Sequence, residues 1–213
     1  PGIRDPLWSR GLGDVYKRQG ENGSGAGVEQ GVQDDIDVYF ATFAKSMAST
    51  GAFIAADKEI IDYLKYNMRS QMFAKSLQMQ LVKGALKRLD MLRNQPEFKA
   101  KLWENVHALQ NGLKANGFDI GNTESCVTPV YLEGTIPEAM ALVKDLRENY
   151  GIFCSIVVYP VIPKGIILLR LIPTASHTLD EVKETLKAFA SIREKLEKGT
   201  YKRFSDALMA SVK

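Results

Sequence analysis

The sequence predicts an α/β protein, on the evidence of its composition and of two residue periodicities. The 213 residues are 45% hydrophobic and 25% charged, which excludes disordered, collagen-like and disulfide-scaffold chains. Runs of β-branched and aromatic residues indicate strands at 36–43, 53–56, 126–132, 152–159 and 166–172. Apolar residues at helical spacing lie between and after these runs. After Gly117 the two patterns alternate, which favours a mixed domain at the C-terminal end.

The first 19 residues differ from the rest of the chain. They have no apolar period, no initial Met and no signal-peptide order. The stretch SRGLGDVYKRQ (9–19) is similar to one reading frame of a common transposase-based sequencing adapter. We therefore expect a non-native segment at 1–19 and a chain that starts within a gene near Gly20. Two of the three net positive charges lie in this segment, so we expect no nucleic-acid partner and no anionic membrane partner.

The first half of the remaining chain is predicted to contain a glycine-rich loop, two strands and three helices. The loop covers 20–31, and the run IDVYFATF (36–43) is typical of a buried strand. Asp57 is placed to cap the first helix. A longer helix is expected to run through Leu77 and on until Pro96 stops it. Pro96 then begins the third helix, which Asn116-Gly117 closes.

The second half carries stronger local signals. Pro129 argues for an edge position of the strand at 126–132. Thr-x-x-Glu capping boxes at 135–138 and 178–181 begin two helices, and Gly199 ends the second one. The expected divisions are 20–95, a connecting helix at 96–116, a small domain at 117–199 and a tail at 200–213. No apolar run approaches the length of a membrane span, so no integral membrane segment is expected.

Both cysteines lie in apolar strands. Cys126 and Cys154 are therefore predicted to be buried free thiols, which indicates a reducing, cytoplasmic compartment. No His, Cys and acidic side chains occur together at metal-ligand spacing, and we expect no metal.

Lys45 is a candidate catalytic residue because of its surroundings. It follows the predicted strand, Thr42 places a hydroxyl beside it, and the small residues SMASTGA (46–52) leave room for a flat ligand. A partly desolvated lysine can lose its proton and form a Schiff base. A lysine after a strand is more often a surface charge, and this alternative stays open on the residues alone.

Arg170 interrupts the apolar strand IILLRLI (166–172). Burying an arginine is unfavourable unless it meets an anion. A core salt bridge and a carboxylate-bearing substrate both satisfy that requirement, and the guanidinium fits a carboxylate with two hydrogen bonds. His177 is interpreted as a structural side chain near a helix start.

From Gly20 to about Lys198 the chain resembles the C-terminal half of the α-oxoamine synthases, which are fold-type I enzymes that use pyridoxal 5′-phosphate (PLP). The resemblance lies in four motifs in family order: GENGSG (20–25), DVYFATFAKSMASTGAFIA (37–55), RSQMFAKSL (69–77) and YPVIPKGIILLRLIPTASHT (159–178). It implies the C-terminal part of a PLP-binding large domain and an α/β small domain with a mainly antiparallel sheet. Within the family, the wording of these motifs resembles that of serine palmitoyltransferase-like members.

The resemblance also implies roles for individual residues. Lys45 would bind PLP as a Schiff base and act as acid and base, Thr42 would contact the phosphate, and Arg170 would hold the substrate carboxylate. Ala44 and Ala74 stand where many members have phosphate-binding hydroxyls, and Lys75 is our guess for a replacement charge. The family's Asp and His that contact the PLP ring would lie upstream, so we expect the chain as written to be inactive.

The implied reaction condenses an amino acid with an acyl-CoA and releases carbon dioxide. The wording of the motifs favours L-serine with a long-chain acyl-CoA, which gives a 3-keto sphingoid base, in a homodimer with a shared active site. A glycine or alanine C-acyltransferase, and a non-catalytic partner subunit, are the alternatives.

Overall fold

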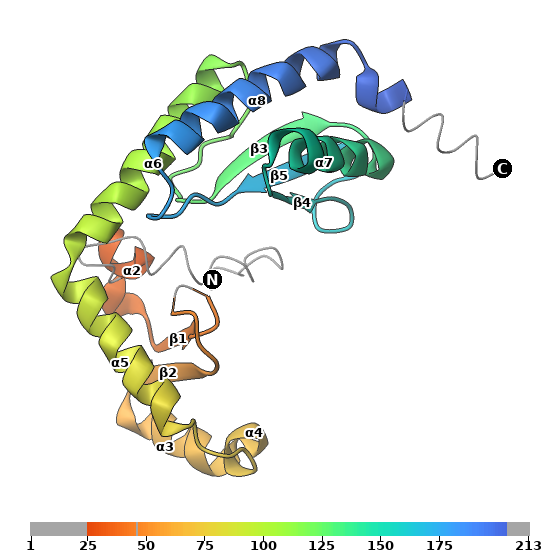
Figure 1. Ribbon diagram of the computed structural model, residues 1–213. Coiled ribbons are helices and arrows are strands. Elements are labelled where there is room, and N and C mark those ends of the chain that lie inside the picture. The colour runs from red at the N-terminus through yellow and green to blue at the C-terminus, as the bar shows by residue number, and fades with distance from the viewer. Residues whose placement is uncertain (1–24, 46, 204–213) are drawn as a thin grey trace. The chain divides into compact units, whose positions relative to one another are not determined.

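The computed structural model describes residues 25–45 and 47–203. The chain divides into two compact units, residues up to Lys99 and residues from Ala100, and each is described by itself (Figure 1). The adapter-like segment, the first part of the glycine-rich loop and the last ten residues of the tail lie outside the described residues. No described helix combines the length with the apolar content that crossing a bilayer requires.

The first unit is built on a two-stranded antiparallel ribbon. Strands β1 (Val38–Thr42) and β2 (Ala52–Ala56) pair with Val38 opposite Ala56 and Thr42 opposite Ala52. A helical turn, α2 (Ala26–Glu29), and a 3-10 turn, η3 (Gln33–Asp35), precede the ribbon. Part of the predicted glycine-rich loop is therefore helical, because the chain turns through α2 after Gly25.

The prediction of two strands is confirmed, but the interpretation of β1 as a buried strand is wrong. Phe40 is 65% exposed, and Ala41 is the one residue of β1 that is buried. The physical reason is that β1 has one partner strand, and the described residues do not cover both faces of the ribbon.

Three helices complete the first unit: α3 (Lys58–Asn67), α4 (Arg69–Met72) and α5 (Met79–Asn94). None of them contains a buried residue. Asp57 stands at the start of α3 as predicted, although its side chain makes no capping bond. The longer predicted helix begins later than expected, since Leu77 lies before α5 in a non-helical segment, 73–78. Leu77 instead contacts Gly51, where an added Cβ would lie 2.7 Å from Leu77 Cδ2.

The second unit contains most of α6 (Pro96–Ala115), then β3 (Thr128–Glu133), α7 (Ile136–Tyr150), β4 (Ser155–Val157), β5 (Ile166–Leu171) and α8 (Leu179–Glu197). The strands form an antiparallel sheet in the order β3-β5-β4. The edge position of β3 is confirmed, and the strand predicted at 152–159 is reduced to three residues. Helices and sheet enclose one apolar core, which includes Leu109, Leu113, Leu142, Leu169, Phe189 and Ile192.

Local capping signals were accurate in this unit. Both predicted capping boxes are present: Thr178 N donates to Glu181 Oε2 at 2.7 Å, and Thr135 N donates to Glu138 Oε2 at the same distance. Gly117 ends α6 with φ of 77°, in the left-handed region that favours glycine. Both cysteines are buried free thiols, as predicted.

Candidate functional site

The loop that carries Lys45 is closed by bonds between the ends of the two strands. Phe43 N donates to Gly51 O at 2.8 Å, and Thr42 Oγ1 donates to the same carbonyl at 3.3 Å. The carbonyl of Lys45 accepts from Ala48 N at 2.7 Å. Lys45 is half-buried. The hairpin therefore holds Lys45 in a short, internally bonded loop.

The hydroxyl of Thr42 already has partners within this loop. Its oxygen accepts from Ala44 N at 3.1 Å while its proton is donated to Gly51 O. A hydroxyl has one proton, so donation to a phosphate would require Thr42 to release Gly51 O. The bond from Thr42 Oγ1 to Gly51 O is long, at 3.3 Å, so replacing Gly51 O by a phosphate oxygen would cost little free energy. Thr42 thus fits a phosphate contact only after this rearrangement.

Lys75 lies apart from the bonded loop in the chain, in the exposed segment 73–78 between α4 and α5. The contact between Leu77 and Gly51 brings this segment to the edge of the loop. The structure shows no interaction of Lys75 with Thr42 or Lys45 within the residues it describes.

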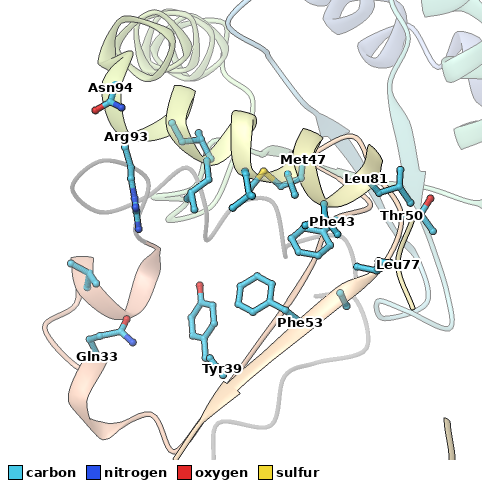
Figure 2. A pocket seen from close by; sticks show the side chains of 18 residues that line it. Gln33, Tyr39, Phe43, Met47, Thr50, Phe53, Leu77, Leu81, Arg93 and Asn94 are labelled. Atoms are coloured by element: carbon cyan, nitrogen blue, oxygen red, sulfur yellow. The ribbon is translucent and has the colours of Figure 1, made fainter. Parts of the chain in front are cut away.

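A groove of about 1220 Å³ lies between the β1–β2 ribbon and α5 (Figure 2). Aromatic rings of the ribbon point into it: Phe53 lies 6.2 Å from Tyr39 and 5.6 Å from Phe43 between ring centroids. Leucines of α5 such as Leu81 form the opposite side. Lys45 and Thr42 do not line this groove. Most of its lining residues are apolar, as on a surface that packs against another part of a protein, and few of them could bind a charged ligand.

Arg170 lies in the second unit, on the central strand of the sheet. The buried residues of β5 are Ile167, Leu169 and Leu171, so Arg170 stands on the opposite face and is half-buried. This corrects the expectation of an arginine within the core. The alternation of the strand explains the difference, because neighbouring residues point to opposite faces.

Ser155 is the partner that the strand register provides for Arg170. The two residues are opposite each other on β4 and β5, and Arg170 Nε donates to Ser155 Oγ at 3.0 Å. Among the described residues, no ion pair includes Arg170, so the core salt bridge considered above is not found there. Because the bond to Ser155 uses Nε, the two terminal nitrogens of the guanidinium can still donate to an anion. Sequence reasoning missed Ser155 because nothing local marks it.

The segment after β5 is tied to α6 by Asn105, which sequence reasoning also missed. Its Nδ2 donates to Thr174 O at 3.1 Å and to His177 O at 2.8 Å. His177 Nδ1 accepts from Thr174 N at 3.0 Å, which places the proton of the neutral ring on Nε2. The structural interpretation of His177 agrees with these bonds. A signal for Asn105 existed, since it is a polar residue on the apolar face of its helix, beside Leu102 and Leu109.

A half-buried carboxylate in the same unit ties α7 to α8 and to the residues after it. Asp145 accepts from Lys195 Nζ at 2.7 Å, Tyr201 Oη at 2.6 Å and Asn149 Nδ2 at 2.6 Å. Burial raises the pKa of Asp145, but these hydrogen bonds outweigh it and the pKa lies below its ordinary value. Burial, together with the bond to Asp145, raises the pKa of Tyr201. These bonds hold α7 against α8 and have a structural role.

The fold and these motifs define a PLP-dependent transferase of fold type I, represented by its C-terminal part. The model of the family "Aminotransferase class I and II" matches residues 14–189. The chain belongs to this family, and the resemblance and the fold class predicted from the sequence are confirmed.

The relatives of the chain include acyltransferases. It is 68% identical over 183 residues to a cysteate-C-fatty acyltransferase of Capnocytophaga ochracea, a match that covers 86% of this chain and 44% of that protein. It is 35% identical over 178 residues to a serine palmitoyltransferase of Sphingobacterium spiritivorum, covering 84% of this chain and 44% of that protein. The chain thus spans less than half the length of these relatives.

Among solved structures, serine palmitoyltransferase with PLP internal aldimine matches with a TM-score of 0.75 and 30% identity, over 83% of this chain and 44% of that one. The family and this PLP-bound relative imply PLP as the cofactor, as the sequence resemblance predicted. The half-buried Lys45 and the small-residue loop fit such a group, whereas Ala44 and Ala74 offer no hydroxyl to its phosphate.

Proposed function

We propose that this chain is the C-terminal part of a PLP-dependent C-acyltransferase of the α-oxoamine synthase type, which joins a fatty acyl group from acyl-CoA to an amino acid. The observation that carries the proposal is the extended similarity to acyltransferases of this type, with 68% identity in one case. The hairpin that presents Lys45 and the arginine held by Ser155 support it, because they provide an amine and an anion-binding group.

Cysteate is the amino acid that we propose as substrate. Identity to the cysteate-C-fatty acyltransferase is 68%, against 35% for a serine palmitoyltransferase. Cysteate carries a sulfonate where serine carries a hydroxyl, so the two substrates share the α-amino and carboxylate groups. L-serine, which the motifs favoured, becomes the second candidate, with a 3-keto sphingoid base as its product.

Lys45 would hold the cofactor through its amine and then move the proton at the α-carbon of the substrate. Arg170 would bind and orient the substrate carboxylate through its terminal nitrogens, with Ser155 fixing the direction of the guanidinium. Thr42 would bind the phosphate after releasing Gly51 O, and Lys75 would add a positive charge near it. PLP, when bound, supplies the electron sink for the carbanion.

The 213-residue chain by itself is not expected to convert substrate to product. Matches that cover 44% of the relatives leave more than half of a related enzyme without a counterpart here.

The test is product analysis with the full-length protein, expressed from the gene after recovery of its upstream codons. The purified enzyme with PLP is given palmitoyl-CoA and, in separate reactions, cysteate, L-serine, glycine or alanine, and products are identified by mass spectrometry. The cysteate adduct is expected to dominate. A dominant serine product would restore the sphingoid-base function, and a dominant glycine or alanine product would support the other alternative.

A Lys45→Ala variant is the matched control. It is expected to lose the visible absorbance of lysine-bound PLP together with all turnover, because no other amine of the hairpin can replace it. Absence of both the absorbance band and any product in the wild-type enzyme would instead identify a non-catalytic partner subunit. The oligomeric state, for which we propose a homodimer, is measured by light scattering on the same preparation.

A further inference from the structure

Asn105 is a polar side chain in a position that otherwise favours an apolar one. It lies on α6, is 1% exposed, and is surrounded by the stripe that includes Leu102, Val106 and Leu109. Its Nδ2 uses both hydrogens, one for each of two carbonyl groups. Its Oδ1 has no hydrogen-bond partner among the described residues. A leucine would fill the same place and avoid the unpaired Oδ1, but it would leave the carbonyls of Thr174 and His177 without this donor, so the amide serves the segment that carries those carbonyls and not the packing of the core.

The two carbonyl groups belong to one segment, residues 172–178, which connects β5 to α8. The segment begins directly after β5, two residues beyond Arg170, and Thr178 at its end caps α8. Thr174 and His177, whose carbonyls Asn105 holds, are also bonded to each other through Thr174 N and His177 Nδ1. The amide therefore holds two points within a short loop, from a position on α6 that is 69 and 72 residues away in sequence.

Arg170 is thus restrained from two directions. On one side, Ser155 on β4 accepts from Nε. At the end of β5, the path of the chain depends on the loop that Asn105 holds. A binding group must be held within a fraction of an ångström to orient a carboxylate well, and such precision depends on the residues that support it.

We propose that Asn105 is a positioning residue for the amino-acid substrate, which acts by fixing loop 172–178 and, through it, the end of β5 that carries Arg170. The proposal rests on the proposed function, in which Arg170 holds the substrate carboxylate. Asn105 itself does not touch the substrate in this scheme. Its loss widens the range of positions of the guanidinium and weakens amino-acid binding, with no direct effect on the acyl-CoA.

The chain offers a matched control in Asn116. Its Nδ2 donates to Leu186 O on α8 at 3.0 Å, which is the same kind of bond, from an amide directly after the end of α6 to a carbonyl far from loop 172–178. Truncation of Asn105 removes two bonds to distant backbone carbonyls, and truncation of Asn116 removes one. A weaker binding of the amino acid in Asn105→Ala but not in Asn116→Ala therefore indicates an effect of the loop that Asn105 holds, and not of a lost side-chain bond in general.

The experiment uses full-length holoenzyme and measures kcat, the KM for the amino acid, the KM for palmitoyl-CoA and Tm. Asn105→Ala is expected to raise the amino-acid KM about 10-fold, with kcat and the acyl-CoA KM within about twofold of wild type. Asn105→Asp keeps the shape of the side chain but loses both donated hydrogen bonds, and it is expected to raise the amino-acid KM at least as much. Asn116→Ala is expected to lower Tm and leave the amino-acid KM unchanged.

Equal amino-acid KM values for wild type, Asn105→Ala and Asn105→Asp would show that Asn105 has only a structural role and would overturn the proposal. If these variants do not fold, Asn105→Ser, which keeps one donor, is measured in their place with the same criterion.

The substrate proposal is judged separately. The comparison is made with whichever amino acid the wild-type enzyme turns over, so a preference for serine would refute cysteate as substrate and still decide the role of Asn105. If calorimetry detects no binding of any of the tested amino acids to the wild-type holoenzyme, both proposals fail.

Discussion

The hydrogen bond between Arg170 and Ser155 yields the sharpest prediction about substrate binding. Arg170 Nε donates to Ser155 Oγ at 3.0 Å, and both side chains are half-buried. In Ser155→Ala the guanidinium keeps its charge but loses the contact that sets its direction. We expect the full-length enzyme to bind the amino acid more weakly while its kcat and its KM for acyl-CoA stay close to wild type.

The magnitude follows from the environment of the bond. A hydrogen bond to a charged group contributes about 1.5–3 kcal/mol when it is buried. Solvent reaches both partners here, so screening reduces this to about 1 kcal/mol. At room temperature that free energy corresponds to a roughly fivefold increase in the dissociation constant of the amino acid.

A double-mutant cycle with Arg170→Lys provides the assay. Lysine has no Nε donor in that position, so the loss of Ser155 should have little further effect in the Arg170→Lys background. Amino-acid dissociation constants of wild type, both single variants and the double variant are measured by calorimetry. Ser191→Ala, a serine on α8 that bonds within its own helix, is the control and should behave as wild type.

The same fivefold loss in both backgrounds would refute the reasoning, because Ser155 would then act without Arg170. An unchanged dissociation constant in Ser155→Ala would also refute it, since the bond would contribute nothing to the orientation of the guanidinium.

Three further predictions concern stability and reactivity. Asp145→Asn should lower the free energy of unfolding in urea by about 2 kcal/mol at pH 7, because charge-assisted hydrogen bonds are lost. Since the pKa of Asp145 is lowered in the folded state, this stabilisation is present above the ordinary pKa of aspartate and disappears as the pH falls through the folded-state pKa. The same difference in unfolding free energy between wild type and variant at pH 2 would contradict this prediction. Burial raises the pKa of Cys154 to about 11, and Cys126 has no exposed surface. At pH 8 both cysteines should therefore react with a thiol reagent only after denaturation, and immediate labelling of the native chain would be inconsistent with the structure. Gly112→Ala should destabilise the fold by about 1–3 kcal/mol, because the added Cβ would overlap the side chain of Leu186 on α8. Gly84→Ala on α5 would meet mainly the flexible end of the Arg88 side chain and should be neutral or stabilising. Equal changes of Tm in the two variants would contradict the packing of Gly112 against Leu186.

Much of the secondary structure follows from local sequence. The capping boxes at 135–138 and 178–181 and the helix start at Pro96 were predicted correctly, because each depends on groups within about four residues of one another. Lys45 could be chosen for the same reason, since the hydroxyl and small residues around it are its neighbours in the chain. The motifs also determined the family, which the comparisons confirmed.

The tertiary structure decided what lies opposite or around these residues. Ser155 meets Arg170 only through the register of β4 and β5, and Asn105 reaches loop 172–178 only because α6 packs beside it. The burial of β1 was mispredicted because an apolar run reports a tendency to be covered, whereas the covering layer must come from elsewhere in the chain. By itself the sequence determined most of the elements, the family and the choice of Lys45 and Arg170 as candidate cations, since these depend on residue type and on near neighbours. The residues that hold Arg170 in place are far from it in the chain, and only the folded arrangement could identify them.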